Sequence, residues 1–336
     1  MDLYDVALHV HQIQPVFELT ISLPSLIANI YFAIRFSKLE CFSPSLRILL
    51  ILSSIITSLS TIVHSIALLI PEKWYSVERG QYVGAFLVYG LHFLTMIFVI
   101  IVDSKFLLVS IERWYAFKHR LSYELNDNGN GAKKVLTIYL TIVAVIVSIK
   151  CACLFLLYGD ETMDERLALS FIAERCIWLF VSNALLASTT WGLGAAHFVY
   201  LQFYTKRTQK DAKTLSERFQ LKQCSNVANV MLPLLIAFAF GVLWSGSCMT
   251  TILYLYFIAG YSTKHVYYQA AYYSIPLYAL HVTAYQCYYF RAMRRVIIQD
   301  LKTLFGIHVE DNSIYPMRNK VTETSMHFAE LNQQWN

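Results

Sequence analysis

The stretch FLLVSIERWYAF, residues 106–117, ends a long apolar run with an adjacent acid–base pair, Glu112 and Arg113. Aromatic residues follow the pair directly. The meaning of this pair depends on the solvent around the apolar run. Of the 336 residues in the chain, 57% are hydrophobic and only 15% are charged, whereas about a quarter of the residues of a soluble protein are charged. The composition therefore favours lipid, and it predicts that the pair marks the end of a membrane-spanning helix whose aromatic residues lie among the headgroups.

Seven segments of the chain are apolar and long enough to cross a bilayer, since one helical crossing needs about 20 mostly apolar residues. They cover residues 13–34, 47–70, 83–111, 134–158, 176–203, 227–259 and 267–290. We therefore expect an all-α membrane protein in which residues 1–290 form a single seven-helix transmembrane bundle. Because no Lys or Arg precedes the first segment, we expect this segment to stay in the protein as a helix rather than to be removed as a signal peptide.

The positive charges of the chain are distributed unevenly between the two ends of these segments. The connections on one side hold 20 of the 27 Lys and Arg residues and those on the other side hold five, while Lys105 and Lys150 fall inside predicted spans. Cytoplasmic connections are the ones that carry excess Lys and Arg, so the N-terminus is expected outside and the C-terminus in the cytoplasm. The net positive charge then matches the inner leaflet and a cytoplasmic partner, and nucleic acid is not expected as a partner.

The residues after the last segment predict a different kind of helix. In RAMRRVIIQDLKTLF, residues 291–305, apolar residues recur at helical spacing, and basic residues occupy the opposite face. A basic amphipathic helix of this kind lies on the anionic lipids of the inner leaflet. Residues 306–336 are polar and are predicted to form a flexible cytoplasmic tail.

Two charged residues, Asp103 and Lys105, interrupt the third segment about two turns before Arg113. A charge at this depth costs about 2.5–3.5 kcal/mol on insertion scales. Residues two apart on a helix point to different sides, so these two are not expected to pair. We expect Asp103 to face the bundle or to be protonated, and Lys105 to extend toward the inner interface. The two charges form either a polar lock near the cytoplasmic end or two charges that the fold tolerates.

The seven cysteines are scattered, and small packing residues inside helices are the simplest interpretation of them. Cys151 and Cys153 are too close together for the usual zinc spacing. A disulfide between Cys176 and one of these two is an open alternative. The sequence contains no phosphate-binding glycine motif and no H-E-x-x-H motif, so we expect neither an enzyme nor a protein that holds a metal or another cofactor.

Two blocks of sequence carry a resemblance to a known family. The block IERWYAFKHRLSYE, residues 111–124, resembles the E-R-x-x-A signature of nematode serpentine chemoreceptors, and LSERFQLKQCSNV, residues 215–227, resembles their L-S-x-R-[FY]-Q-x-x-E-N block. With seven predicted helices, the chain resembles the Sra superfamily of these G-protein-coupled receptors, and it is most like the epsilon (Sre) class. It departs from the pattern at Gln223, where an acidic residue is usual, at Asn226, to which the Asn is displaced, and at Trp114.

The resemblance implies a role for the acid–base pair. In such receptors the acid, here Glu112, restrains the arginine, here Arg113, while the receptor is inactive. When the sixth helix swings outward, the arginine meets a heterotrimeric G protein. Asp103, which lies deeper in the same helix, is expected to belong to this activation switch.

The resemblance also implies a ligand site in the outer half of the bundle, in a receptor of the plasma membrane of sensory cells and of their cilia. There Tyr89, His92 and Phe93 stand at the depth where a chemosensory ligand is expected. An aromatic cavity with few charges suits a small, mostly apolar chemical. Further aromatic residues of the fifth, sixth and seventh segments are expected to contribute, namely Trp178, Trp244, Tyr254 and Tyr273.

Two alternatives remain open at this point. A seven-helix ligand-gated channel of the insect odorant-receptor kind would place its N-terminus inside the cell. A membrane transporter or enzyme would need paired carboxylates or a His/Asp cluster within the membrane. Here Glu18, Asp103 and Lys150 lie at different depths on different helices, so no reaction centre is evident.

Overall fold

The computed structural model describes residues 3–39, 43–119, 130–173, 175–209, 211–212, 215–254 and 274–305. In these ranges the chain consists of helices and short connections and contains no strand. Five helical segments are long and apolar enough to cross a membrane, namely Glu18–Ser37, Pro44–Leu69, Tyr82–Lys118, Lys133–Leu157 and Gln220–Trp244. The all-helical character is thus confirmed for the described residues, and the five apolar helices support a membrane protein, whereas the number of crossings and their direction stay predictions.

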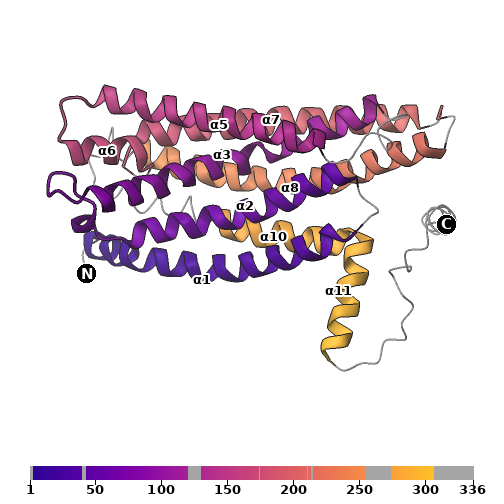
Figure 1. Cartoon of the computed structure of the whole chain (residues 1–336), viewed down its shortest axis with the longest axis horizontal. Helices are drawn as coiled ribbons and strands as arrows, with labels where there is room; N and C mark the ends of the chain where they lie inside the picture. Colours follow the sequence, from indigo (N-terminus) through magenta and orange to yellow (C-terminus); the bar gives the residue numbers. More distant parts are fainter. Residues whose placement is uncertain are drawn as a thin grey trace. The chain divides into compact units, whose positions relative to one another are not determined.

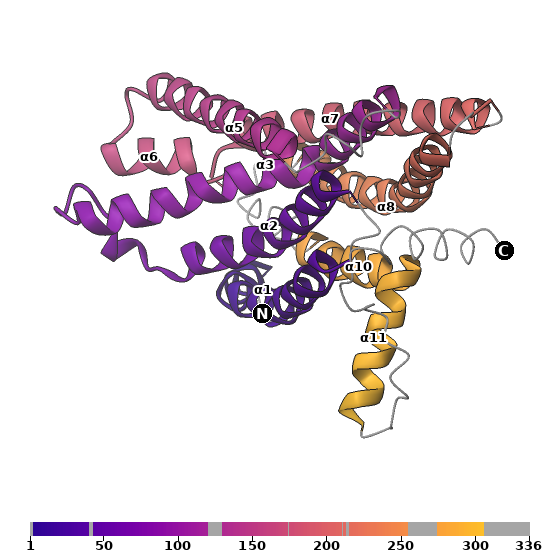
Figure 2. The ribbon, with the colours of Figure 1, turned by 45° about the vertical axis from the view of Figure 1, so that its right-hand side comes forward.

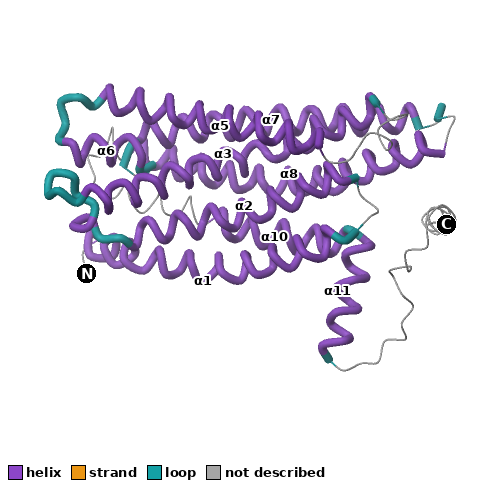
Figure 3. The backbone as a smooth tube through the Cα atoms, in the orientation of Figure 1, coloured by secondary structure: helices purple, strands orange, loops and turns teal. Residues whose placement is uncertain are grey.

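Each of the seven predicted segments coincides with a helix. These are α1 (Leu3–Ser37), α2 (Pro44–Leu69), α3 (Tyr82–Lys118), α5 (Asn130–Leu157), α7 (Ile177–Thr208), α8 (Leu215–Tyr254) and α10 (Ser274–Tyr289). Between them lie the short helices η1 (Glu72–Trp74) and α6 (Met163–Phe171), and α11 (Arg291–Leu304) follows α10. Figure 3 shows how short loops join the helices. The predicted residues 255–259 and 267–273 lie outside the described ranges.

Two of the seven helices do not reach the apolar length of the other five. The stretch ASTTWGLGAAH in the middle of α7 is rich in small and polar residues, which lowers its mean hydropathy. The described part of α10 has only 16 residues. Both helices nevertheless belong to the same bundle, because α7 packs against α3 and α8, and α10 packs against α1, α2 and α8.

The helix α3 occupies the middle of the bundle, where it packs against α2, α5, α6, α7 and α8. Figures 1 and 2 show it between the other long helices of the unit that spans Met1–Met293. The helix α10 lies against α1, α2 and α8 and so closes the bundle. A polar side chain on α3 can therefore reach several helices that are far apart in the sequence.

Two helix boundaries differ from the prediction at the end that carries Arg113. The helix α3 continues to Lys118, so Glu112 and Arg113 lie inside the helix and do not end it, because the residues after them contain no Gly or Pro to stop it. The helix α8 begins at Leu215, well before residue 227. Its first turns are stabilised by packing, since Leu221 and Cys224 are buried against residues of α3 and α7.

The close approach of α3 and α7 depends on one glycine. A Cβ atom added to Gly194 would lie 3.0 Å from the backbone N atom of Leu107 and 3.2 Å from the Cβ atom of Phe106. The indole N–H of Trp191, one turn earlier on α7, donates a hydrogen bond of 3.0 Å to the carbonyl of Leu235 on α8. The middle of α7 is thus held close to both neighbours by a small residue and a polar contact.

The second compact unit, Arg294–Asn336, begins inside α11. Within this helix Val296, Ile297, Leu301 and Leu304 share one side, while Arg295 and Lys302 lie on the other. Residues Arg291–Leu304 thus form a helix with an apolar and a basic side, and its place on a membrane surface stays a prediction. The predicted tail, residues 306–336, lies outside the described residues.

Candidate functional site

The guanidinium of Arg113 lies in the interior of the bundle, and its side chain is 0% exposed. A buried guanidinium cannot lose its charge and offers five N–H donors, so it needs acceptors around it. Its Nε atom donates to Glu112 Oε2 at 2.5 Å, and its Nη2 atom donates to Glu112 Oε1. The predicted acid–base pair is therefore formed, as a two-point contact between neighbouring residues of α3.

Two further acceptors come from other parts of the chain. The Nη1 atom of Arg113 donates to Gln223 Oε1 on α8 at 3.2 Å, and its Nη2 atom donates to Ser43 Oγ at 2.9 Å. Ser43 directly precedes α2. The thiol of Cys224, which follows Gln223, lies 3.7 Å from the Arg113 carbonyl as a weak donor. Arg113 thus connects α3 to α8 and to the start of α2.

The nature of these acceptors decides how firmly α8 is held. The charge of Arg113 is balanced within its own helix by Glu112, whereas α8 contributes the neutral amide of Gln223. A hydrogen bond to a charged group contributes about 1.5–3 kcal/mol. This contact is strong enough to favour one arrangement of α8 and weak enough to be exchanged for another.

Polar and aromatic contacts continue from Arg113 toward α7. Ser110 Oγ lies 2.9 Å from His197 Nδ1, and the ring of Trp114 lies 5.7 Å from that of His197 and 5.4 Å from that of Tyr200. Trp114 is half-buried and packs between two helices, although its position in the sequence predicts a place among the lipid headgroups. The large side chain of Trp114 is thus accommodated against α7.

Lys105 does not extend toward the inner interface, contrary to the prediction. Its side chain is only 7% exposed, and its ammonium lies 4.3 Å from the centre of the Tyr278 ring and 5.4 Å from that of Phe106. The aromatic faces of α10 and α3 attract the cation and keep it inside the bundle.

Asp103 is half-buried and lies on another side of α3. Thr190 of α7 donates to its backbone carbonyl at 3.3 Å, and its carboxylate interacts electrostatically with Lys105 and with Lys150 of α5. Among the residues that the structure describes, no ion pair joins Asp103 to Lys105, which agrees with the prediction that they do not pair. Asp103 is not in contact with Arg113, so its role in a switch stays a prediction.

A buried polar cluster around Asn29 connects α1, α2 and α10. Asn29 Nδ2 donates to Ser58 Oγ at 2.7 Å and to the Ser25 carbonyl at 2.7 Å. Asn29 Oδ1 accepts from Ser54 Oγ, and from Thr283 Oγ1 at 2.6 Å. These residues were not predicted from the sequence. Their signal is the spacing of Ser25 and Asn29 on α1, and of Ser54 and Ser58 on α2, which puts polar groups on one face of an apolar helix.

A second buried contact joins α1 to α2 farther toward the α6 end. The imidazole Nδ1 of His64 lies 3.2 Å from the nearer carboxylate oxygen of Glu18, and both side chains are buried. Glu18 is therefore partnered, which explains how a carboxyl group is accommodated within the first helix.

The predicted ligand residues of α3 are covered by α6. The Tyr89 ring lies 5.7 Å from that of Phe171 and 5.8 Å from that of Tyr75, and its hydroxyl donates to the Asp164 carbonyl at 3.4 Å. Phe93 packs against the same Phe171 ring at 6.4 Å. His92 is buried as well.

The other predicted ligand residues do not join this group. Trp178, Trp244 and Tyr254 are 56%, 53% and 56% exposed, and Tyr273 lies outside the described residues. None of these three packs into the buried group around Tyr89, so the shared aromatic cavity stays a prediction. A ligand role for each of these residues stays a prediction.

The helix α6 itself was not predicted, although its start has a recognisable signal. Thr162 and Glu165 have the spacing of a capping box, and Thr162 Oγ1 accepts from the Glu165 N–H at 3.4 Å. Asp164 accepts from Ser76 Oγ at 2.5 Å and from the Val77 N–H at 2.6 Å. These contacts attach α6 to the connection between α2 and α3.

Charged groups strengthen the same attachment. Arg175 forms ion pairs with Glu72 and, at 3.8 Å, with Glu165. Burial lowers the pKa of the Arg175 guanidinium, and burial together with the Asp164 carboxylate raises the pKa of Tyr75. Cys151, Cys153 and Cys176 are all free thiols. The disulfide considered from the sequence is therefore not formed, and noncovalent contacts hold α6.

The described residues contain no group of His, Cys, Asp and Glu side chains that could hold a metal ion. Comparison of the sequence with known protein families gives no match, and comparison with curated proteins gives no significant match. The features that bear on function are therefore the geometry around Arg113 and the two sequence blocks, 111–124 and 215–227, whose residues meet there.

Proposed function

We propose that this chain is a chemosensory G-protein-coupled receptor of the plasma membrane, with seven transmembrane helices and its N-terminus outside. A small external chemical would bind in the half of the bundle that contains Tyr89 and Phe93. The other end, which contains Arg113, would engage a heterotrimeric G protein. The observation that carries the proposal is the buried guanidinium of Arg113, which holds α3, α8 and the start of α2 together through acceptors that can be exchanged.

We assign the contacts of Arg113 to the resting state of such a switch. In this state Arg113 donates to Gln223 and α8 lies against α3. If α8 moves outward, Arg113 loses this acceptor and keeps Glu112, so its charge stays balanced while an N–H group turns toward the space that α8 leaves. A partner protein that offers oxygen acceptors in this space stabilises the moved arrangement. The glutamine at position 223, where the resembling receptors have an acidic residue, therefore makes a weaker contact with Arg113 than a carboxylate would, at the same place on α8.

Two other features support a receptor. The blocks 111–124 and 215–227, which resemble nematode serpentine chemoreceptors of the epsilon class, are the segments whose residues meet at Arg113. At the opposite end, α6 covers Tyr89 and Phe93 through contacts that can open without breaking a covalent bond. A receptor needs this arrangement, in which one end can admit a small molecule and the other can change its partners.

The proposal is tested in cells that express the full chain together with a panel of G proteins. A screen of volatile and water-soluble chemicals first identifies an activating ligand. Arg113→Ala is then expected to abolish ligand-evoked G-protein activation at equal surface expression, while Lys118→Ala, an exposed residue of the same helix end, leaves it unchanged. Unchanged signalling by Arg113→Ala would refute the switch.

The direction of insertion is tested separately. An epitope tag at the N-terminus is expected to be stained in cells that have not been permeabilised. Staining only after permeabilisation would favour a ligand-gated channel with the opposite orientation.

A further inference from the structure

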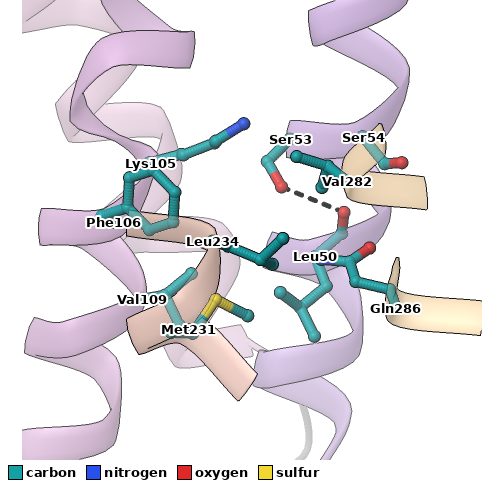
Figure 4. A pocket seen from close by; sticks show the side chains of 10 residues that line it. All are labelled: Leu50, Ser53, Ser54, Lys105, Phe106, Val109, Met231, Leu234, Val282 and Gln286. Carbon is teal, nitrogen blue, oxygen red and sulfur yellow. Dashed lines mark hydrogen bonds between the residues drawn. The ribbon is translucent and has the colours of Figure 1, made fainter. Parts of the chain in front are cut away.

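A small cavity lies between α2, α3, α8 and α10, about one helical turn from Arg113 (Figure 4). The space that water-sized molecules can occupy in it is about 20 Å³, which is enough for one or two water molecules. A second space of about 10 Å³ adjoins it and shares Ser53, Lys105 and Val109. The first cavity is lined by Leu50, Ser53, Ser54, Lys105, Phe106, Val109, Met231, Leu234, Val282 and Gln286.

Lys105 is the only charged residue in this lining. Figure 4 shows its side chain extended from α3 toward α2, with Ser53 on the facing helix. Its ammonium offers three N–H donors, and its contacts within the described residues are the faces of two aromatic rings. Aromatic faces attract a cation, but they do not replace the oxygen acceptors that it loses on leaving water.

The charge of Lys105 is not balanced inside the cavity. The nearest acid is Asp103, which lies on another side of α3 and is also within electrostatic range of Lys150. Residues two apart on a helix do not face each other. A buried ammonium costs several kcal/mol unless an anion or oxygen acceptors lie beside it, and no acidic residue lines this cavity.

A polar group across the cavity from Lys105 is incompletely satisfied (Figure 4). Gln286 is 3% exposed, and its Oε1 atom has no hydrogen-bond partner among the described residues. Rotation of this amide by 180° exchanges its oxygen and nitrogen atoms and presents an N–H donor instead. Ser53 Oγ donates to the Leu50 carbonyl at 3.0 Å, and a hydroxyl can turn its hydrogen to another acceptor.

We propose that this cavity binds a single monatomic anion, chloride being the abundant one, next to the ammonium of Lys105. The side chains of Gln286 and Ser53 supply further donors from α10 and α2. The small volume excludes phosphate, sulfate and carboxylates with an organic group. A bound chloride joins α2, α3 and α10 at the cavity and stabilises the closed bundle, whether or not the protein signals to a G protein.

The proposal is tested with purified full-length protein in detergent micelles at constant ionic strength. The midpoint of thermal unfolding is measured while sodium gluconate, whose anion is too large for the cavity, is replaced by sodium chloride or bromide. The midpoint should rise with either halide and then saturate, because a ligand that binds only the folded state stabilises it. Broadening of the ³⁵Cl resonance by the protein, reversed by bromide, reports the same binding directly.

Variants assign the effect to the cavity. Lys105→Met should raise the chloride concentration of half-saturation about tenfold or more, the weakening expected from the loss of one charge-assisted hydrogen bond. Lys73→Met, which removes an exposed lysine of a connection, should leave it unchanged. If Lys105→Met does not fold, Gln286→Leu keeps the ammonium and should still weaken the chloride effect.

Two results would overturn the proposal. The first is an equal unfolding midpoint of the wild-type protein in chloride and gluconate, with no broadening of the ³⁵Cl resonance. The second is a chloride effect of wild-type size in Lys105→Met or Gln286→Leu, which would place the anion elsewhere. Neither result tests G-protein coupling, so the failure of the anion site would leave the proposed function unaffected, and the failure of the proposed function would leave the anion site unaffected.

Discussion

Under the proposed receptor function, replacing Gln223 by alanine should raise G-protein signalling in the absence of any ligand. In the structure the Gln223 amide oxygen accepts a hydrogen bond of 3.2 Å from the buried guanidinium of Arg113. Alanine removes this acceptor and with it a direct contact between α8 and α3. The charge of Arg113 stays balanced by Glu112, so the bundle is expected to fold while α8 is held less firmly.

The size of the effect follows from the strength of the contact. A hydrogen bond to a charged group contributes about 1.5–3 kcal/mol. Since each 1.4 kcal/mol changes an equilibrium tenfold, its loss shifts the balance between the resting and moved arrangements by about 10-fold to about 150-fold. If the moved arrangement has a resting population of about 1%, it rises to about 10–60%. Gln223→Glu should act in the opposite direction and lower the basal signal, because a carboxylate accepts more strongly from a guanidinium.

The assay is basal G-protein activation in cells that express the full chain, normalised to the amount of an N-terminal tag at the surface. Asn226→Ala is the matched control, because Asn226 is exposed on the same end of α8. The reasoning is refuted if Gln223→Ala reaches the surface and signals no more than Asn226→Ala. It is equally refuted if Gln223→Ala and Gln223→Glu change the basal signal in the same direction.

Three further predictions concern the bundle and its cap. Gly194→Val should push α7 away from α3 and lower the free energy of unfolding by about 1–3 kcal/mol, because the added Cβ atom lies 3.0 Å from the α3 backbone. Gly192→Val is the control, since an added Cβ atom there has nothing within 4 Å. Thermal unfolding compares the two variants, and equal midpoints would contradict the close approach. Asn29→Leu should lower the free energy of unfolding by about 1–3 kcal/mol, because it leaves buried hydroxyls without their shared amide, and an unchanged unfolding midpoint would count against the polar cluster. Asp164→Ala should increase amide hydrogen exchange in α6, which loses its contacts to the connection between α2 and α3, while Asp160→Ala, an exposed residue nearby, should leave this exchange unchanged.

The positions of the long helices could be predicted from the sequence because an apolar run of sufficient length is a signal within the run itself. Their ends could not be predicted equally well. The helix α8 begins at Leu215 because Leu221 and Cys224 pack against α3 and α7, and such packing depends on distant residues. The helix α6 is different, since its capping box at Thr162 is a local signal that the sequence itself contains.

The candidate site could be predicted only in part. The pair of Glu112 and Arg113 is local, so it is visible in a stretch of 12 residues, whereas Ser43 and Gln223 reach Arg113 through the fold. The prediction of a shared aromatic cavity used the depth of each residue along its helix, and depth does not tell toward which side of the helix a side chain points. In the structure Trp178 and Trp244 are exposed, whereas Tyr89 is buried. Lys105 shows the same limit. Its long side chain can extend toward the inner interface or into the bundle, and the contact with the Tyr278 ring keeps it in the bundle.

The hydrogen bond from Thr283 to Asn29 has a consequence for the biosynthesis of the protein, because it joins residues that are 254 positions apart. When α1 and α2 enter the membrane during translation, the helix that carries Thr283 has not yet left the ribosome. Until it arrives, one acceptor position of the Asn29 amide oxygen stays unoccupied next to lipid, where unsatisfied polar groups are costly. A chain that stops before α10 should therefore accumulate to a lower level than the full chain. Co-expression of a separate fragment that contains α10 should restore this level.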